Sequence, residues 1–222
     1  LSLVGSEMCI RDSVDPVQGS GDQAVNFSGE KHTGRLQRTI NLTVTTNGGA
    51  KKALVVNQAA AAEVVRSDSP NASVQKTGGN VTITGKSNST KLTFAVTPAE
   101  DNGLTLQLPD NYTAAGKTTA NGAVIADDPG AAGEFVWSIT ISDVPANVTI
   151  EELTATLKVT AAGGQIANVT VTQAAGDSTI ELDEETINLD VNGTQQTVNV
   201  TSNDSWTWAQ AAARTVLRMM GR

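Results

Sequence analysis

Few residues in this sequence can do acid–base or nucleophilic chemistry. His32, in the loop GEKHTG, is the single histidine, so any Ser–His–Asp arrangement would depend on it. We interpret it as a solvated loop histidine. The carboxylate pairs at residues 151–152 and 184–185 flank expected strands, where charges discourage edge pairing. Because the sequence also lacks a phosphate-binding glycine loop, a nucleophile elbow and metal-ligand spacing, we predict no enzyme activity and no cofactor.

Oxygen ligands for a cation are the second kind of chemistry to consider. Asp127 and Asp128 precede a Pro-Gly pair, and Asp101 lies in the segment EDN of the same expected module. Carboxylate oxygens in loops are suitable ligands for Ca²⁺. The alternative is two turns in which Asp and Asn side chains bond the local backbone. We favour the turns and therefore predict no metal. The candidate ligands for the alternative, a Ca²⁺ site, are Asp101, Asp127 and Asp128.

Aromatic side chains that stack on sugar rings are the third possibility. In the segment FVWSITI, Phe135 and Trp137 share a face with Ile139 and Ile141, so that face is expected to lie in a core. Phe94 follows Leu92 into the core on the same grounds. The aromatic residue that remains is Tyr112, in a segment at residues 109–133 that reads as a long loop. Tyr112 is therefore the candidate carbohydrate-binding residue.

Composition limits the partners. The 222 residues carry a net charge of −8 with a pI near 4.6, which argues against binding nucleic acid through its phosphates. No apolar run approaches the roughly 20 residues of a membrane-spanning helix. Thr, Val, Asn, Ala and Gly dominate, which is typical of strands and turns. The single cysteine, Cys9, excludes a disulfide within the chain.

Alternating apolar and polar residues recur along the chain. INLTVTT, VTIT, KLTFAV, LTLQL, FVWSITI, ATLKVT, NVTVTQ, TIELD, TINLDV and TVNVT all have this period of two, and Gly- or Asn-rich turns separate them. Short strands with one apolar face predict antiparallel sheets that pack face to face. The expected fold class is all-β, with no helix before the last residues.

One hairpin sequence occurs twice. Residues 41–60, NLTVTTNGGAKKALVVNQAA, match residues 156–175, TLKVTAAGGQIANVTVTQAA, without a gap. The first glycines of the two Gly-Gly turns are Gly48 and Gly163, which gives an offset of 115 residues. Residues 74–88 resemble residues 189–203 more loosely. The period predicts whole modules: the end of a first at 14–61, a complete second at 62–175 and the start of a third at 176–208.

The two partial modules have a geometric consequence. The first supplies closing strands and the third supplies opening strands, and neither set can bury its apolar face alone. Short connections attach them to opposite ends of the complete module. We therefore expect them to lie apart and partly unpacked, or to pair between chains by strand exchange.

Both ends of the chain differ in character from the rest. Residues 3–13, LVGSEMCIRDS, resemble the translation of a transposase sequencing adapter, so we interpret residues 1–13 as an artefact. Residues 209–222 are Ala-rich and basic, and are interpreted as a frame-shifted read or a short helix. The chain is expected to be part of a longer gene product whose signal peptide, if it has one, lies upstream.

The third module resembles a known family. STIELDEETINLDVNGTQQTVNVTSNDSWTW is similar to the start of a BACON domain, with Gly193 in the turn, TVNVTSN as the strand and Trp206 after it. TVTQAA at residues 170–175 resembles the family's last strand. The resemblance covers the module ends only, and a related Bacteroidota immunoglobulin-like family is the alternative. It implies tandem immunoglobulin-like antiparallel β-sandwich modules on exported proteins.

These observations lead to two function hypotheses. The first is a non-catalytic surface or secreted tandem-repeat protein that acts as a spacer, an adhesin stalk or an accessory module, with neighbouring modules of its own chain as partners. The alternative is a carbohydrate-binding module for glycan or mucin, either alone or attached to a glycoside hydrolase. An extracellular or cell-surface location follows from the resemblance.

Overall fold

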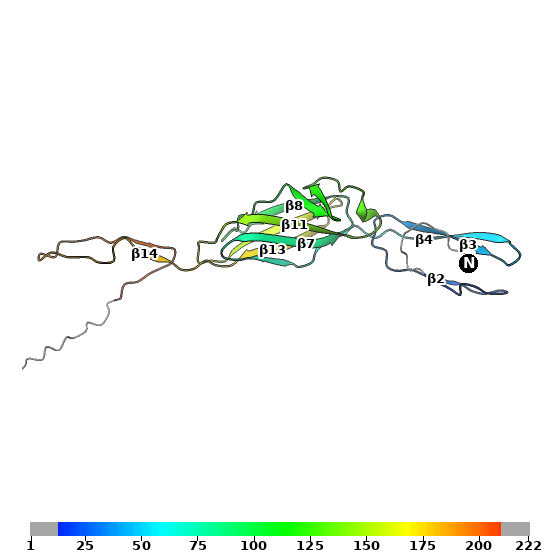
Figure 1. Cartoon of the computed structure of the whole chain (residues 1–222), viewed down its shortest axis with the longest axis horizontal. Helices are drawn as coiled ribbons and strands as arrows, with labels where there is room; N and C mark the ends of the chain where they lie inside the picture. The colour runs from blue at the N-terminus through cyan, green and yellow to red at the C-terminus, as the bar shows by residue number, and fades with distance from the viewer. Residues whose placement is uncertain (1–12, 210–222) are drawn as a thin grey trace, which may run out of the picture.

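The computed structural model describes residues 13–209, and Figure 1 shows their arrangement. Three parts follow one another along the long axis. We call residues 13–61 the head, residues 62–175 the central sandwich and residues 176–209 the tail. The expectations for residues 1–12 and for nearly all of the 209–222 segment lie outside the described residues. Within the described part, no helix is long and apolar enough to cross a membrane.

Two sheets build the central sandwich, and one hydrophobic core joins them. The five-stranded sheet has the order β10-β9-β11-β7-β5, and the four-stranded sheet has the order β6-β13-β12-β8. All neighbours are antiparallel except β13 and β6. The strands are β5 (Val65–Ser67), β6 (Asn71–Val74), β7 (Gly79–Ser87), β8 (Leu92–Pro98), β9 (Asn111–Ala114), β10 (Lys117–Ala120), β11 (Phe135–Val144), β12 (Leu153–Ala161) and β13 (Ile166–Gln173).

The core forms because alternate residues of the long strands point inward. In β11, Phe135, Trp137, Ile139 and Ile141 are buried, as their period of two predicted. Trp137 is fully buried and meets Phe94 edge to face, with ring centroids 5.5 Å apart. The prediction that Trp137 and Phe94 are core residues is confirmed.

The segment at residues 109–133 is not the long loop that the sequence suggested. It holds β9, β10 and the short 3-10 helix η1 (Pro129–Ala131). β9 and β10 form a hairpin whose two turn residues, Ala115 and Gly116, both have positive φ. That backbone is the type I′ turn, which matches the twist of two-residue hairpins. The alternation in this segment is short and rich in Thr and Ala, and for that reason it resembled a loop.

Further strands flank the central sandwich, and Figure 1 shows the head and the tail at its opposite ends. The expected strand at residues 187–191 is absent, as is that at residues 104–108, although Leu104 and Leu106 are buried. The flanking strands are β1 (Ser13–Asp15), β2 (Asn26–Ser28), β3 (Arg38–Thr45) and β4 (Lys51–Gln58) in the head, with β14 (Ile180–Leu182) and β15 (Val200–Ser202) in the tail. The described chain is all-β apart from η1.

The 115-residue offset is also present in the three-dimensional pairing. In β3–β4, Leu42 is opposite Leu54, and in β12–β13, Leu157 is opposite Val169. Both hairpins close through the same turn, in which Gly49 and Gly164 have φ of 86° and 89°. β14 likewise pairs with β15 in the register that β5 makes with β7. The head thus repeats the closing hairpin of the central sandwich, and the tail repeats its opening pair.

Candidate functional site

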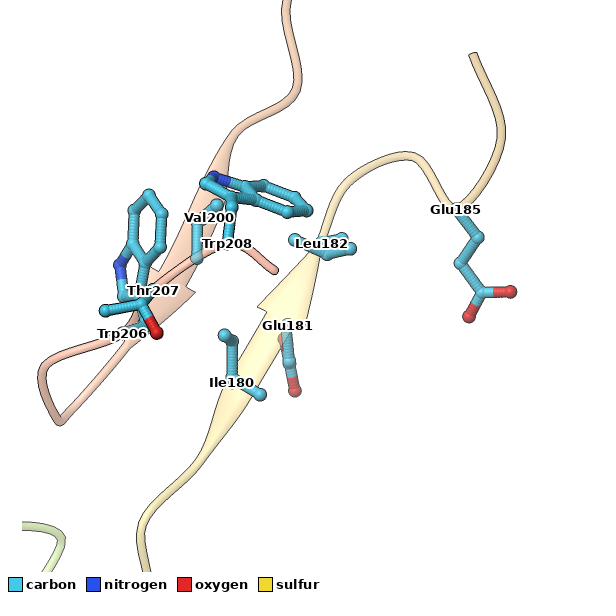
Figure 2. A pocket seen from close by; sticks show the side chains of 8 residues that line it. All are labelled: Ile180, Glu181, Leu182, Glu185, Val200, Trp206, Thr207 and Trp208. Atoms are coloured by element: carbon cyan, nitrogen blue, oxygen red, sulfur yellow. The ribbon is translucent and has the colours of Figure 1, made fainter. Parts of the chain in front are cut away.

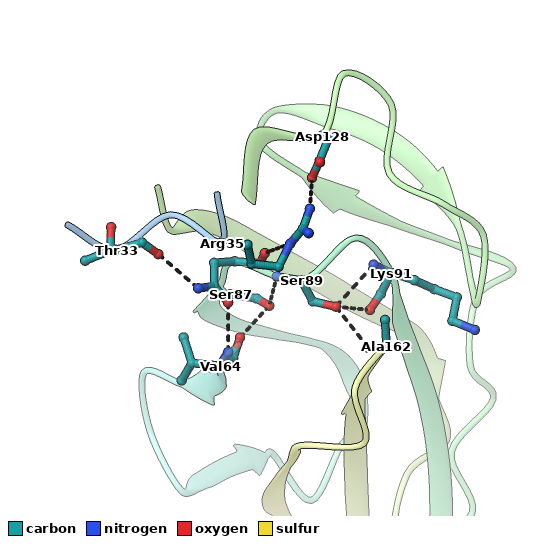
Figure 3. Close-up of polar contacts among 9 residues, drawn as sticks. Thr33, Arg35, Val64, Ser87, Ser89, Lys91, Asp128 and Ala162 are labelled. Carbon is teal, nitrogen blue, oxygen red and sulfur yellow. Dashed lines mark hydrogen bonds and ion pairs between the residues drawn. The ribbon is translucent and has the colours of Figure 1, made fainter. Parts of the chain in front are cut away.

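The most elaborate polar site of the described chain lies where the head meets the central sandwich. It is built on Ser87, Asn88 and Ser89, at the end of β7, and all three are fully buried. Figure 3 shows how Thr33 and Arg35 of the head converge on this segment with Val64 and Asp128. We call it the head junction.

Asn88 connects three segments through one side chain. Its Oδ1 accepts a hydrogen bond from the backbone N–H of Val64 at 2.8 Å. Its Nδ2 donates to the carbonyl oxygens of Thr33 and Ala62, each at 2.9 Å. Since Thr33 belongs to the head, this buried amide ties the head to the sandwich.

The two serines satisfy the neighbouring backbone. Ser87 Oγ donates to the Val64 carbonyl at 2.7 Å. Ser89 Oγ donates to the Lys91 carbonyl at 2.8 Å and accepts from the Ala162 N–H at 2.9 Å. The Ser87 bond links β7 to the residue before β5, and the Ser89 bonds link the end of β7 to the turn between β12 and β13, so the junction is continuous with the sandwich.

Arg35 adds a second link from the head. Its Nε donates to the Asn88 carbonyl at 2.8 Å, and its guanidinium pairs with Asp128. The Arg35 backbone N–H also donates to the Gly130 carbonyl at 2.9 Å. The backbones approach closely here: a Cβ at Gly130 would lie 2.0 Å from the Asn88 carbonyl oxygen. Gly130 is therefore the residue that lets η1 pack onto the junction.

A second junction, between the sandwich and the tail, repeats this pattern 115 residues later. Asn203 Oδ1 accepts from the Thr179 N–H at 2.8 Å, and Nδ2 donates to the Val148 carbonyl at 2.9 Å and the Asp177 carbonyl at 2.8 Å. Ser202 Oγ donates to the Thr179 carbonyl at 2.6 Å. The partners are those of Asn88 and Ser87 shifted by one period. We call this the tail junction.

The tail carries a hollow lined by aromatic and acidic residues, which Figure 2 shows. Trp206 and Trp208 meet edge to face with ring centroids 5.8 Å apart, and they are 45% and 69% exposed. The other lining residues are Ile180, Glu181, Leu182, Glu185, Val200 and Thr207. This is the place in the described chain where two exposed tryptophans meet.

Tyr112 does not lie where the sequence suggested. It is part of β9 and only 3% exposed, and its ring packs against Phe94 at a centroid distance of 4.8 Å. Burial raises the pKa of its hydroxyl, and a smaller effect of the Leu92 backbone lowers it. The candidate sugar platform is therefore a core residue, because β9 adds its inward face to the five-stranded sheet.

The three aspartates proposed for Ca²⁺ have other surroundings. Asp127 pairs with Lys117, which holds the pKa of the Asp127 carboxyl below its usual value. Asp128 pairs with Arg35 in the head junction. Between residues 13 and 209, no three acidic, His or Cys side chains gather as a metal site would require. Asp127 and Asp128 have positive φ, as does Asn102 beside Asp101, which is typical of turn residues.

Neither junction was predicted from the sequence. The pair Ser87-Asn88 recurs as Ser202-Asn203 at the same offset as the hairpins, and this recurrence was visible in the sequence. Its meaning was hidden because small polar residues at the end of a strand usually indicate a solvated turn.

Comparison with known proteins assigns the family. A family model described as Toastrack DUF4097 matches residues 37–209, which include β3 and β4, the central sandwich and the tail. No curated protein matches the chain. Since the match covers well over half of the sequence, the chain belongs to the Toastrack DUF4097 family.

Proposed function

We propose that this chain is a non-catalytic tandem-module protein that acts as a stiff spacer or stalk at a cell surface or in secreted form. The observation that carries the proposal is the repetition of one hydrogen-bonded junction at both ends of the central sandwich. A spacer needs a defined angle between its modules, and the Asn88 and Asn203 side chains make equivalent bonds at the two ends of the sandwich.

The stiffness has a physical basis at Asn88. Bending the head away from the sandwich would break the bond to Thr33 and leave the buried Asn88 amide without that acceptor. An unsatisfied buried polar group costs about 1–3 kcal/mol. Domains joined by weak contacts move freely by default, so bonds of this kind are what a rigid array requires.

We include in this proposal the resemblance of the modules to BACON and related immunoglobulin-like domains. The tail sequence, with TVNVTSN before Trp206, resembles the start of a BACON domain. An immunoglobulin-like identity of the modules and an exported Bacteroidota protein are consistent with it. Sandwich modules repeated in tandem suit a stalk, because each one adds length without needing a site of its own.

Glycan binding is the second candidate function. Tyr112 no longer supports it, since the ring is buried. The exposed pair of Trp206 and Trp208 supports it, because sugar rings stack on exposed aromatic faces. Affinity gels that contain mucin or plant polysaccharide test it. Retardation of the full chain that Trp206→Ala removes would favour binding, whereas unchanged mobility favours the spacer.

Small-angle X-ray scattering of the full chain, over a dilution series, tests the spacer. We expect the dilute chain to scatter as one elongated particle of constant shape. Asn88→Ala and Asn203→Ala each release one junction, so the maximum dimension should fall and the profile should fit an ensemble of bent forms. Asn41→Ala, at an exposed site on β3, is the matched control. A wild-type profile that already fits a broad ensemble would overturn the proposal.

A further inference from the structure

The four-stranded sheet of the central sandwich ends at β8 on one side, and this edge is covered without a further strand. Residues 121–125, which we call the edge strap, run beside the start of β8. The Gly122 N–H donates to the Leu92 carbonyl at 3.0 Å. The Ile125 N–H donates to the Thr90 carbonyl at 2.9 Å. The strap therefore binds the edge with its own backbone.

Asn121 extends the strap by one position through its side chain. Its Oδ1 accepts from the Phe94 N–H at 2.8 Å, and its Nδ2 donates to the Phe94 carbonyl at 3.0 Å. A neighbouring strand would bind the same two groups, so one amide takes the place of one strand residue. The Asn121 backbone N–H donates to the carbonyl of Asp110, the residue before β9, at 2.8 Å, which holds the amide in position.

The rest of the β8 edge is short. Alternate residues of an edge strand turn their N–H and C=O groups outward, so Val96 is the next residue after Phe94 to do so. Pro98 follows at the end of β8 and has no N–H. With Asn121 in place, the outward groups of Val96 alone lack a partner in the described chain between Phe94 and Pro98. One open residue is too short a template for a further strand.

The opposite edge of the same sheet carries a smaller cap of the same kind. The Pro70 carbonyl, just before β6, accepts from the Thr170 N–H of β13 at 2.9 Å, so the next residue, Asn71, faces outward. Ser69 Oγ donates to the Asn71 carbonyl at 2.7 Å and accepts from the Asn71 N–H at 3.2 Å. Both edges of the sheet thus have a polar side chain bound to the outward groups of one edge residue.

We propose that Asn121 closes the β8 edge and keeps the central sandwich from pairing edge to edge with β8 of a second copy. An open edge strand is a template for other chains, and β8 is rich in residues that favour strands. Without the Asn121 amide, Phe94 and Val96 are open together. These two residues are self-complementary in an antiparallel pair, because Phe94 of each copy faces Val96 of the other, with Ala95 on the two-fold axis.

A repeated chain makes such a cap useful. This chain repeats one hairpin at an offset of 115 residues. Similar units joined in one chain meet at a high effective concentration, and mispairing between them is a characteristic failure of repeat proteins. The proposal does not depend on the spacer function, since an open edge is a liability whatever the chain does. All residues of the cap belong to the central sandwich.

Amide exchange of dilute protein tests the cap itself. Asn121→Ala removes the acceptor of the Phe94 N–H, so exchange of this amide should accelerate at least tenfold relative to the Leu157 amide of β12. Asn168→Ala, at an exposed site on β13 of the same sheet, is the matched control and should leave the ratio unchanged. A ratio that Asn121→Ala also leaves unchanged would show that the side chain does not close the edge.

Disulfide trapping in the full chain tests the consequence. In a Cys9→Ser background, Ala95→Cys places a thiol on the exposed side of β8. In the proposed pair the two Cα atoms at this position are about 4.5 Å apart, which is within the range that a disulfide bridges. After mild oxidation, we expect Asn121→Ala to raise the yield of disulfide-linked dimer at least tenfold over the chain that keeps Asn121.

A register control and a second variant complete the test. Thr93→Cys lies on the same exposed side of β8, but the two copies of this position are about 14 Å apart in the proposed pair and should not be trapped. Asn121→Ser, whose side chain is too short to reach both groups of Phe94, should raise trapping as Asn121→Ala does. A dimer yield that both Asn121 variants leave unchanged, or equal yields from Ala95→Cys and Thr93→Cys, would overturn the proposal.

Discussion

Gln58 and Gln173 stand 115 residues apart at the ends of β4 and β13, and their side chains donate to equivalent carbonyls. Gln58 Nε2 reaches the Glu30 carbonyl at 2.9 Å, and Gln173 Nε2 reaches the Pro145 carbonyl at 2.7 Å. The bond is the same, but the surroundings differ: Gln173 is 1% exposed, whereas Gln58 lies at the half-buried edge of the head. Comparing the two residues therefore shows how much the burial inside the central sandwich adds to the same hydrogen bond.

Gln173→Ala should destabilise the protein far more than Gln58→Ala. Gln173→Ala removes a fully buried side chain together with its hydrogen bond to the Pro145 carbonyl, which costs about 1–3 kcal/mol. Gln58→Ala should change the free energy of unfolding by less than about 0.5 kcal/mol, as is typical of surface positions. Urea unfolding of dilute protein, followed by tryptophan fluorescence, measures both. Equal effects would show that the head is packed as tightly as the sandwich.

Leu157→Ala and Leu42→Ala form a matched pair for the apolar core. Leu157 is fully buried between the sheets, so its truncation should cost about 2–5 kcal/mol. Leu42 occupies the same place in β3 but is only half-buried, and its truncation should cost less than about 1 kcal/mol. Thermal unfolding by circular dichroism at micromolar concentration makes the comparison. A cost for Leu42→Ala near that for Leu157→Ala would contradict the exposed state of β3.

Tyr112→Phe should leave stability unchanged or raise it slightly at neutral pH. Within the described residues, the buried Tyr112 hydroxyl has no hydrogen-bond partner of ordinary geometry. Burial raises its pKa, so the folded state binds this proton more tightly than the unfolded state does. The resulting stability is present below about pH 10, the unfolded pKa, and is lost as pH rises through the folded pKa. Urea midpoints between pH 8 and 11 should fall less for Tyr112→Phe than for the wild type; parallel curves would refute this.

Acid should loosen the pairing of β14 with β15 in the tail. The side chain and backbone of Asn199 donate hydrogen bonds to Asp183, which hold the pKa of its carboxyl below the usual value. That contribution is present above the unfolded pKa of about 4 and is lost as pH falls through the lower folded pKa. The protection factors of the β14 and β15 amides, which correct the exchange rates for the intrinsic effect of pH, should therefore fall on acidification. Asp183→Asn should remove most of this fall and Glu185→Gln should retain it; the reverse pattern would argue against the assignment.

The sequence predicted those parts of the fold in which alternation is long and apolar. Trp137 could be placed in the core because Ile139 and Ile141 continue its face. Tyr112 could not be placed, because β9 is only four residues long and becomes a strand by pairing with β10 and β11. The residues near Ile187 show the opposite case: their alternation is clear, yet no strand forms without a partner.

The junctions could not be predicted from sequence patterns, because they too depend on contacts between segments that are distant in the sequence. Asn88 looks like any turn asparagine until the backbones of Thr33, Ala62 and Val64 converge on it. That convergence depends on tertiary structure, in particular on the close approach at Gly130. Only the 115-residue recurrence of the Ser-Asn pair was present in the sequence.

The distance distribution between a spin label in the head and one in the sandwich tests the rigid junction most directly. Thr43→Cys and Ala95→Cys place the labels at exposed sites in a Cys9→Ser chain, diluted with unlabelled protein so that only intrachain distances count. Gly130→Ala forces a methyl group against the Asn88 carbonyl, whereas a Cβ at Gly133 meets nothing nearer than 3.4 Å. We predict one narrow distance for the wild type and for Gly133→Ala, and a broad distribution for Gly130→Ala. A broad wild-type distribution, or a narrow one unchanged by Gly130→Ala, would contradict the account.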